Sequence, residues 1–289
     1  MLNEKIEKFK NNGKSFYWAS RILNRNKNDK IYNLYFILRE LDDIADNQNN
    51  ENEFFKKLYD FFDMSKNNEL PYRLEKHKDF FLYIKNDSLM NKNFKDFITG
   101  LIFDQKDNVI IDSQDELLNY CYRVAGTIGV MMCPILNVKN EHATIPATNL
   151  GIAMQLTNIA RDVYEDALSN RRYLPSSWTN GIEPKLIIGK SDCIESVAYL
   201  SVKDGIKKTI ELAEKYYEDA KKGYSYLPLR SRLCIAVAAN IYREIGKKIK
   251  KENYNWSSYR HFVKNYEKLY ITLKSIISEF YLIFKEKIQ

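Results

Sequence analysis

Apolar residues recur at helical spacing along almost the whole chain, and this periodicity limits its folds more than any other feature. No run shows the strict alternation of a half-buried β-strand. Gly (10) and Pro (6) are scarce among the 289 residues, which disfavours a turn-rich β fold. The sequence therefore predicts an all-α protein. Helices are expected over residues 14–24, 28–47, 51–64, 75–86, 91–104, 113–136, 141–169, 192–222, 229–250 and 257–286.

The chain shows no internal repeat and no low-complexity linker, so we expect a single all-α domain over residues 1–289. The first residues are charged and lack an apolar stretch, which argues against a secretory signal. No window of about 18 residues is free of charge, so no membrane-spanning helix is expected. The segment 270–284 is interrupted by Lys274 and Glu279, and it is expected to form a packed or interfacial helix.

The net charge of +7 favours an anionic partner, such as a diphosphate, an acidic membrane surface or a nucleic acid. Nucleic acid is disfavoured because no Lys/Arg block alternates with aromatic residues. None of the cysteines lies in a C-x-x-C pair, so we expect neither a zinc site nor a dithiol motif. A reducing cytoplasm is the default location. The cysteines are Cys121, Cys133, Cys193 and Cys234.

An acidic stripe marks the segment YFILRELDDIAD, residues 35–46. Its polar members follow one another by four, three and four residues, so they share one face of a helix. Asp43 lies beside that face, and apolar residues flank it. Because both sides of such a helix are suited to burial, the acidic side is expected to face a cavity. The members of the stripe are Tyr35, Arg39, Asp42 and Asp46.

A second acidic stripe occupies the segment GIAMQLTNIARDVYEDA, residues 151–167. It repeats the first pattern, with acids at i and i+4, an apolar opposite side and a nearby arginine, Arg161. For either segment alone, a solvated acidic helix face is the simpler interpretation, and the occurrence of both lowers its weight. The members of this stripe are Gly151, Gln155, Asn158, Asp162 and Asp166.

Two acidic helices that face one cavity could hold Mg²⁺ ions around a diphosphate. Mg²⁺ takes oxygen ligands and bridges carboxylates to phosphates, and Arg and Lys would complete the anion site. The sequence offers no comparable pair of nucleophile and base. Its histidines, His77, His142 and His261, are isolated from one another.

The segment NYCYRVAGTIGVMM, residues 119–132, has a helical pattern that contains Gly126 and Gly129. An interior Gly costs about 1 kcal/mol relative to Ala, so both positions require an explanation. One interpretation is close packing against another helix. The other is a groove along which a hydrocarbon tail can lie.

Together these segments resemble the squalene/phytoene synthase family. The motifs YCYRVAGTIGVMM and GIAMQLTNIARDVYEDALSNRRYLPSSW are similar to its two long signature blocks, and DDIAD resembles its first aspartate-rich motif. GKSFYWASRIL resembles the N-terminal block. The stretch LPLRSRLCIAVAANIYREIGKKI resembles the bacterial phytoene synthases more than other branches of the family. The resemblance covers residues 13–250.

The resemblance implies an isoprenoid-synthase fold with a central cavity, a Mg²⁺ cluster for which Mn²⁺ can substitute, and no NADPH. Its implied metal ligands are Asp42, Asp43, Asp46, Asn158, Asp162 and Asp166. The catalytic set comprises Asp42, Asp46, Asp162, Asp166 and Tyr242. The residues implied to bind substrate, including the hydrocarbon channel, are Ser15, Phe16, Tyr35, Arg39, Tyr120, Val124, Ala125, Gly126, Gly129, Gln155, Arg161, Arg171 and Tyr173.

The implied reaction joins two geranylgeranyl diphosphates head to head, through a cyclopropyl diphosphate, to phytoene in carotenoid biosynthesis. A squalene, dehydrosqualene or presqualene diphosphate synthase that uses two farnesyl diphosphates is the nearest alternative. A non-catalytic helical assembly factor is more remote because both acidic motifs are intact. The VAGTIG and QLTNIARDV blocks argue against a head-to-tail prenyltransferase or a terpene cyclase. Because the product is apolar, we expect a cytoplasmic enzyme with peripheral contact to the inner face of the membrane.

Overall fold

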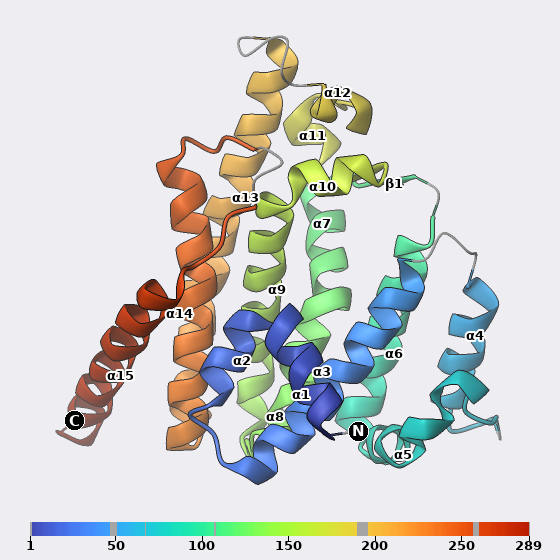
Figure 1. Ribbon diagram of the computed structural model, residues 1–289, viewed down its shortest axis with the longest axis vertical. Coiled ribbons are helices and arrows are strands. Elements are labelled where there is room, and N and C mark those ends of the chain that lie inside the picture. The colour runs from blue at the N-terminus through green and yellow to red at the C-terminus, as the bar shows by residue number, and fades with distance from the viewer. Residues whose placement is uncertain are drawn as a thin grey trace.

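The computed structural model describes residues 2–46, 51–66, 68–106, 108–189, 196–256 and 260–288. Long helices dominate it, and several run side by side along the long axis of the molecule (Figure 1). The all-α prediction is confirmed. The helices are α1 (Leu2–Asn12), α2 (Lys14–Ser20), α3 (Arg25–Ala45), α4 (Asn52–Phe61), α5 (Lys78–Asn86), α6 (Ser88–Asp104), α7 (Gln114–Cys121), α8 (Thr127–Ile135), α9 (Thr144–Arg161), α10 (Val163–Leu168), α11 (Ser176–Thr179), α12 (Pro184–Ile188), α13 (Val197–Lys221), α14 (Leu229–Lys251) and α15 (Asn265–Ile288).

Helix α9 lies at the centre of the bundle and packs against α8, α13 and α14. Its apolar side is fully enclosed, with Leu156 and Ile159 almost inaccessible to solvent. Burial of each such side chain stabilises the fold by about 1.5–3 kcal/mol. The polar stripe on the other side of α9 is thereby fixed in orientation, which is how the sequence pattern determines where Asn158 and Asp162 point.

The helix expected over residues 141–169 is interrupted at Asp162. Helix α9 ends at Arg161 and α10 begins at Val163, while Asp162 itself has φ −101° and ψ 16°. Helix α10 therefore runs across the end of α9 (Figure 1). A single non-helical residue leaves the apolar spacing almost unchanged, so the periodicity does not reveal the break.

The helix expected over residues 113–136 contains one π-helical stretch, Tyr122–Gly126, between α7 and α8. A π-helical turn inserts one extra residue and often occurs at functional sites. Here it overlaps the first three residues of the VAGTIG motif, 124–126. The stretch packs against α9.

Two short strands, which the sequence pattern did not indicate, pair in parallel: β1 (Val109–Ile110) with β2 (Arg171–Arg172). Each is too short to show alternation. The pairing fixes the segment after α10 against the end of α6. This small sheet therefore determines the position of Arg171.

The helix boundaries differ from the expected ones at both ends of the chain. The N-terminal segment forms an unexpected helix, α1, whose Phe9 is buried. The start of the helix expected at 192 lies outside the described residues, and the described part begins as α13 at Val197. The C-terminal helix begins at Asn265 rather than 257. None of the described helices combines the length and the apolar character needed to cross a membrane.

Candidate active site

The carboxylates of both acidic motifs gather where four elements end. Asp42 and Asp46 lie at the C-terminal end of α3, Asp162 between α9 and α10, and Asp166 within α10. The C-terminal end of α6 contributes Asp104. Figure 1 shows the ends of α3 and α6 on the side of the molecule where α10 and β1 lie. Both acidic stripes therefore contribute to one region, as the sequence predicts.

Arg171 connects the first acidic motif to the segment that follows the second. Its Nη1 donates to Asp46 Oδ1 at 2.9 Å, and its Nη2 donates to the main-chain oxygen of Asp104 at 3.3 Å. The nearby Tyr173, Asp46 and Asp104 keep the pKa of Arg171 above its usual value although burial opposes this. The guanidinium thus remains charged and can attract an anion to this end of the site.

Asp104 is a site residue that the sequence analysis missed. The hydroxyl of Tyr173 donates to its Oδ1 at 2.8 Å, and that of Tyr120 donates to Oδ2 at 3.0 Å. The two rings stack with their centroids 4.7 Å apart. Burial raises the pKa of Asp104 to about 6, although both hydroxyls lower it. A single acid at the end of an apolar helix gives no sequence signal for such a role.

The crowding of like charges also affects Asp42 and Asp166. Burial, together with Asp46 and Asp104, raises the pKa of Asp42 to about 7. Half of the Asp42 side chain nevertheless stays accessible, as expected for a carboxylate that lines a concave site. Burial and Asp162 raise the pKa of Asp166 well above its ordinary value. Such a cluster attracts cations, since a bound cation would stabilise the charged forms.

Asp162 is bound by two guanidinium groups. Arg161 donates through Nε at 2.7 Å and Nη2 at 2.5 Å, and Arg260 donates through Nε at 2.9 Å and Nη2 at 2.7 Å. Arg260 is a second residue that sequence reasoning missed. It is 98 residues from Asp162 and lies before α15, in a segment expected to be helical.

Arg39 and Asp43 form an ion pair beside Asp42. Arg39 Nη2 lies 2.7 Å from Asp43 Oδ1, and Lys8 of α1 lies 2.9 Å from Oδ2. Burial would raise the pKa of Asp43, but Lys8 and Arg39 hold it below its usual value. The Nε of Arg39 is buried and has no partner among the described residues. This donor fits the predicted contact with a diphosphate oxygen.

Aromatic residues surround the same region. Phe16 and Tyr242 have ring centroids 4.9 Å apart, and Tyr35 lies against Phe9 at 4.4 Å. Ser15 precedes Phe16 in the first turn of α2. Burial raises the pKa of Tyr242, although the nearby Arg161 lowers it. Tyr242 therefore keeps its proton at neutral pH, and its role in catalysis remains a prediction.

The glycine-bearing segment packs tightly against α9. A Cβ on Gly129 would lie 2.1 Å from the main-chain oxygen of Ala147, and one on Gly126 would lie 3.1 Å from Thr148. Gly151 on α9 similarly lies against Ala125. Close helix packing thus accounts for both glycines. The predicted hydrocarbon channel along Val124, Ala125, Gly126 and Gly129 remains a prediction.

The residues present fit a divalent cation shared with phosphate. Asn158 donates through Nδ2 to Gln155 Oε1 at 3.2 Å, and its buried Oδ1 has no partner in the described structure. Glu165 Oε2 is likewise buried without one. Within the described ranges, no three His, Cys, Asp or Glu side chains converge to hold an ion by themselves. Mg²⁺ usually binds one or two carboxylates together with substrate phosphates, so this donor set suits it.

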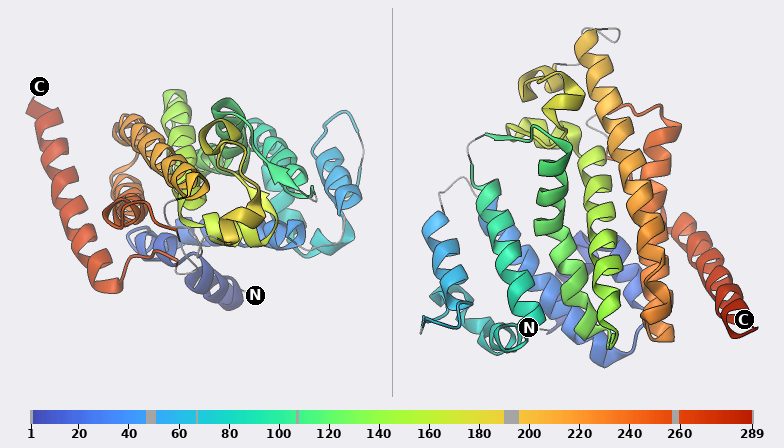
Figure 2. Two further views of the ribbon diagram at one scale, coloured as in Figure 1. Left: turned by 90° about the horizontal axis from the view of Figure 1, so that it is seen from above. Right: turned by 180° about the vertical axis from the view of Figure 1, so that it is seen from behind.

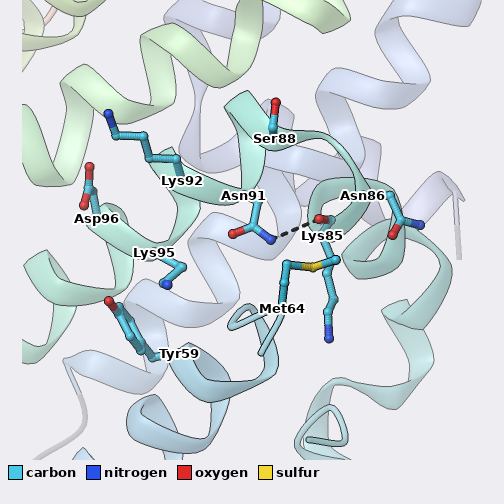
Figure 3. Close-up of a pocket in the computed structure, with 9 residues that line it drawn as sticks. All are labelled: Tyr59, Met64, Lys85, Asn86, Ser88, Asn91, Lys92, Lys95 and Asp96. Atoms are coloured by element: carbon cyan, nitrogen blue, oxygen red, sulfur yellow. Dashed lines mark hydrogen bonds between the residues drawn. The ribbon is translucent and has the colours of Figure 1, made fainter. Parts of the chain in front are cut away.

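A surface pocket of about 440 Å³ lies elsewhere, near α4, α5 and α6 (Figure 3). Lys85 lies over the ring of Phe61 at 4.4 Å, and Lys95 lies over Tyr59 at 4.7 Å. None of the predicted site residues lines this pocket. The pocket is therefore separate from the acidic site. The central cavity between the helices stays a prediction.

Comparisons with known proteins agree with the predicted fold and motifs. A family model described as "Squalene/phytoene synthase" matches residues 9–267. The chain is 31% identical over 252 residues to a 15-cis-phytoene synthase of Enterobacter agglomerans, covering 82% of this chain and 81% of that protein. It is 28% identical over 286 residues to the corresponding protein of Pantoea ananas, covering 94% and 90%.

Two solved structures are similar to this protein. A ligand complex of a dehydrosqualene synthase superposes with a TM-score of 0.76 at 27% identity, covering 97% of this chain and 96% of that one. The squalene synthase HpnC of Alicyclobacillus acidocaldarius superposes with a TM-score of 0.67 at 17% identity, covering 89% and 97%. The second similarity concerns the fold alone.

Proposed function

The chain belongs to the squalene/phytoene synthase family, and we propose that it is a phytoene synthase that uses two geranylgeranyl diphosphates. Its family makes it a prenyltransferase that joins two prenyl diphosphates head to head. The observation that carries the proposal is the meeting of both acidic motifs at one site, beside the Arg171–Asp46 contact. The similarity to bacterial and plant proteins named phytoene synthase supports the choice of product.

In this proposal the carboxylates and amide oxygen of the two motifs hold Mg²⁺. The ligands would be Asp42, Asp46, Asn158, Asp162 and Asp166, with Asp43 held near them by Arg39 and Lys8. When bound, Mg²⁺ would neutralise the diphosphate leaving group as its C–O bond breaks. Arg39, Arg161 and Arg171 would donate to the diphosphate oxygens.

The remaining side chains would orient the two substrates and protect the carbocations. Ionisation of the donor would give an allylic cation, which the 2,3-double bond of the second substrate attacks. Proton loss would form a cyclopropyl diphosphate. After a second ionisation and rearrangement to a 1–1′ linkage, a final proton loss would give phytoene. The faces of Phe16, Tyr35 and Tyr242 would stabilise the cations and exclude water.

Tyr120 and Tyr173 form the polar end of the proposed substrate site. Both donate to Asp104, which fixes the positions of their hydroxyl oxygens. An ionised Asp104 would raise the basicity of the two hydroxyl oxygens. Either oxygen could accept a proton from the substrate while its own hydroxyl proton passes to the Asp104 carboxylate; the departing diphosphate is the other candidate base.

A second candidate within the family acts on two farnesyl diphosphates to give squalene, dehydrosqualene or presqualene diphosphate. The structural similarity to a dehydrosqualene synthase over 97% of the chain supports this second candidate. A squalene synthase quenches the final cation with hydride from NADPH. The proposed enzyme needs none, because it ends with loss of a proton.

Product analysis tests the proposal directly. Purified protein is incubated with Mg²⁺ and geranylgeranyl diphosphate without NADPH, and in parallel with farnesyl diphosphate with and without NADPH. A C40 product with the phytoene triene absorbance in the first reaction is the expected result. If only the farnesyl diphosphate reactions give a product, and that product is a C30 compound, the second candidate replaces phytoene synthase as the proposed function.

A non-catalytic role is distinguished by the metal dependence. If neither substrate gives a product and EDTA does not change substrate binding, the assembly-factor alternative replaces the enzyme.

We also propose that the protein works in the cytoplasm at the inner face of the membrane, because the product is almost entirely apolar.

A further inference from the structure

The polarity of helix α15 (Asn265–Ile288) is opposite to that of a helix on the surface of an ordinary globular protein. The side that faces the protein body buries the polar residues Lys268, Ser275 and Glu279. The apolar Ile271 is buried beside them, and Ile276 packs against the core. Ser275 accepts a hydrogen bond from Asn240 at 2.8 Å. An ordinary surface helix instead buries its apolar stripe. The outward direction of the apolar side of α15 therefore requires an explanation.

The outer side of α15 exposes a stripe of large apolar and aromatic residues. Figure 2 shows α15 standing at the edge of the molecule, with its C-terminal end directed away from the other helices. A contiguous exposed patch of this kind marks an interaction surface. Its members are Tyr266, Leu269, Tyr270, Leu273, Ile277, Phe280, Tyr281, Phe284 and Ile288.

All the acidic residues of α15 are engaged by cations of α14. Glu267 accepts from Lys248 at 2.7 Å, while Glu279 and Glu286 both accept from Arg232, at 2.6 Å and 2.9 Å. On the outer side, by contrast, Lys274 and Lys285 are exposed. The outer face thus combines apolar residues with uncompensated positive charge.

We propose that the outer face of α15 docks this protein on the surface of an anionic lipid bilayer. Aromatic and aliphatic side chains would enter the interface between headgroups and acyl chains, and the lysines would meet lipid phosphates. The function proposed above gives this contact a purpose, because an apolar product must reach a bilayer. The physical argument for docking depends only on the surface itself.

A second copy of the chain fits this face less well. A two-fold symmetric contact would place the same lysines of both copies in one apolar interface. The acids that could neutralise them are already bound to Lys248 and Arg232. An anionic bilayer supplies the missing negative charge.

Vesicle flotation without substrate tests the proposal. The wild-type protein is compared with the variant Leu273→Glu, Ile277→Glu and Phe284→Glu, which changes three exposed positions of the stripe. A matched control, Tyr72→Glu, Leu186→Glu and Val197→Glu, changes three exposed apolar residues on other elements. Vesicles contain phosphatidylcholine alone or mixed with phosphatidylglycerol. Circular dichroism confirms that each variant is folded.

We expect the wild type and the control to float with the anionic vesicles, and the α15 variant to bind at least about tenfold more weakly. A second variant, Lys274→Glu with Lys285→Glu, should lose the preference for anionic over neutral vesicles. Equal binding by the wild type and the α15 variant, or no binding by the wild type, would overturn the proposal. So would a wild-type dimer that ignores vesicles and that the α15 variant makes monomeric.

The prenyltransferase assay in detergent separates this proposal from the proposed function. The α15 variant should keep wild-type turnover of detergent-dispersed substrate, because it leaves the acidic site unchanged. Vesicle binding by a protein that makes no phytoene would refute the function and leave the docking surface in place. Phytoene formation by a protein that binds no vesicles would do the opposite.

Discussion

Arg171 Nη1 lies 2.9 Å from Asp46 Oδ1, although 125 residues separate the two in the chain. The contact joins the end of α3 to strand β2, just after α10, so that each acidic motif is held relative to the other. Asp104, whose main-chain oxygen accepts from the same guanidinium, extends this arrangement to α6. The site is thus assembled at the ends of helices that pack against one another elsewhere, in the apolar core.

Removal of a predicted metal ligand should abolish catalysis without unfolding the protein. We expect Asp42→Ala and Asp162→Ala each to lower kcat by at least about a thousandfold, because the charge of the leaving group would no longer be neutralised. Steady-state product formation measures this effect. Asp204→Ala is the control, since Asp204 pairs only locally with Lys208 on α13. Wild-type turnover by both site variants would refute the metal assignment.

Arg260 should contribute to diphosphate binding. Its guanidinium lies against Asp162, and metal bound to this carboxylate would compete for the same oxygens. The displaced guanidinium would then be available to the diphosphate. Arg260→Ala should raise KM by about tenfold or more, because one charge-assisted hydrogen bond to the diphosphate is lost. Isothermal titration with inorganic pyrophosphate and Mg²⁺ measures the same loss directly.

The exposed Arg230, which donates to Asn24 at 2.6 Å, provides the control for this experiment. Arg230→Ala removes the same charge from another face of the protein. An equal loss of pyrophosphate affinity in both variants would show that Arg260 acts only through the net charge of the protein.

The metal-free protein should become more stable as the pH falls from about 8 to about 6. The pKa values of Asp42 and Asp104, about 7 and about 6, lie above the ordinary value of 3.8, so the folded chain binds protons more readily than the unfolded one. Stability therefore decreases as pH rises through these values. We expect Tm in EDTA to be roughly 3 °C or more higher at the lower pH.

Two comparisons make the pH experiment specific. The double variant Asp42→Asn, Asp104→Asn should weaken this pH dependence, because of the three carboxyls with a raised pKa only Asp166 then still titrates. Mg²⁺ with pyrophosphate should also reduce it, since bound cations favour the ionised carboxylates. A Tm that rises with pH over the same interval in the wild-type protein in EDTA would contradict the prediction.

Gly129→Ala should destabilise the fold. The added Cβ would lie 2.1 Å from the main-chain oxygen of Ala147, so α8 and α9 would have to separate. Overpacking of this kind typically costs about 1–3 kcal/mol, and denaturant unfolding measures it. Gly189→Ala is the matched control because its nearest neighbour would be 3.7 Å away. Equal stabilities of the two variants would show that the glycine is not needed for packing.

The local pattern of the chain was enough to predict the helices and the two acidic stripes. Helical periodicity repeats every few residues, so Asp42 and Asp46 could be placed on one side of a helix from the sequence alone. The polar side of the second helix followed in the same way from Asn158 and Asp162. What the pattern did not reveal was the break at Asp162, because one non-helical residue leaves the spacing of the apolar side almost intact.

Other features depend on which distant segments the fold brings together. Asp104 and Arg260 are single residues without a motif, and they become part of the site only because α6 and the segment before α15 pack near α10. The reversed polarity of α15 likewise depends on Arg232 and Lys248 of α14, which draw its acids inward. The sequence by itself determined the helices and the residues on each of their faces, since these are local properties. Only the tertiary structure decided which faces meet, because that depends on packing across the whole chain.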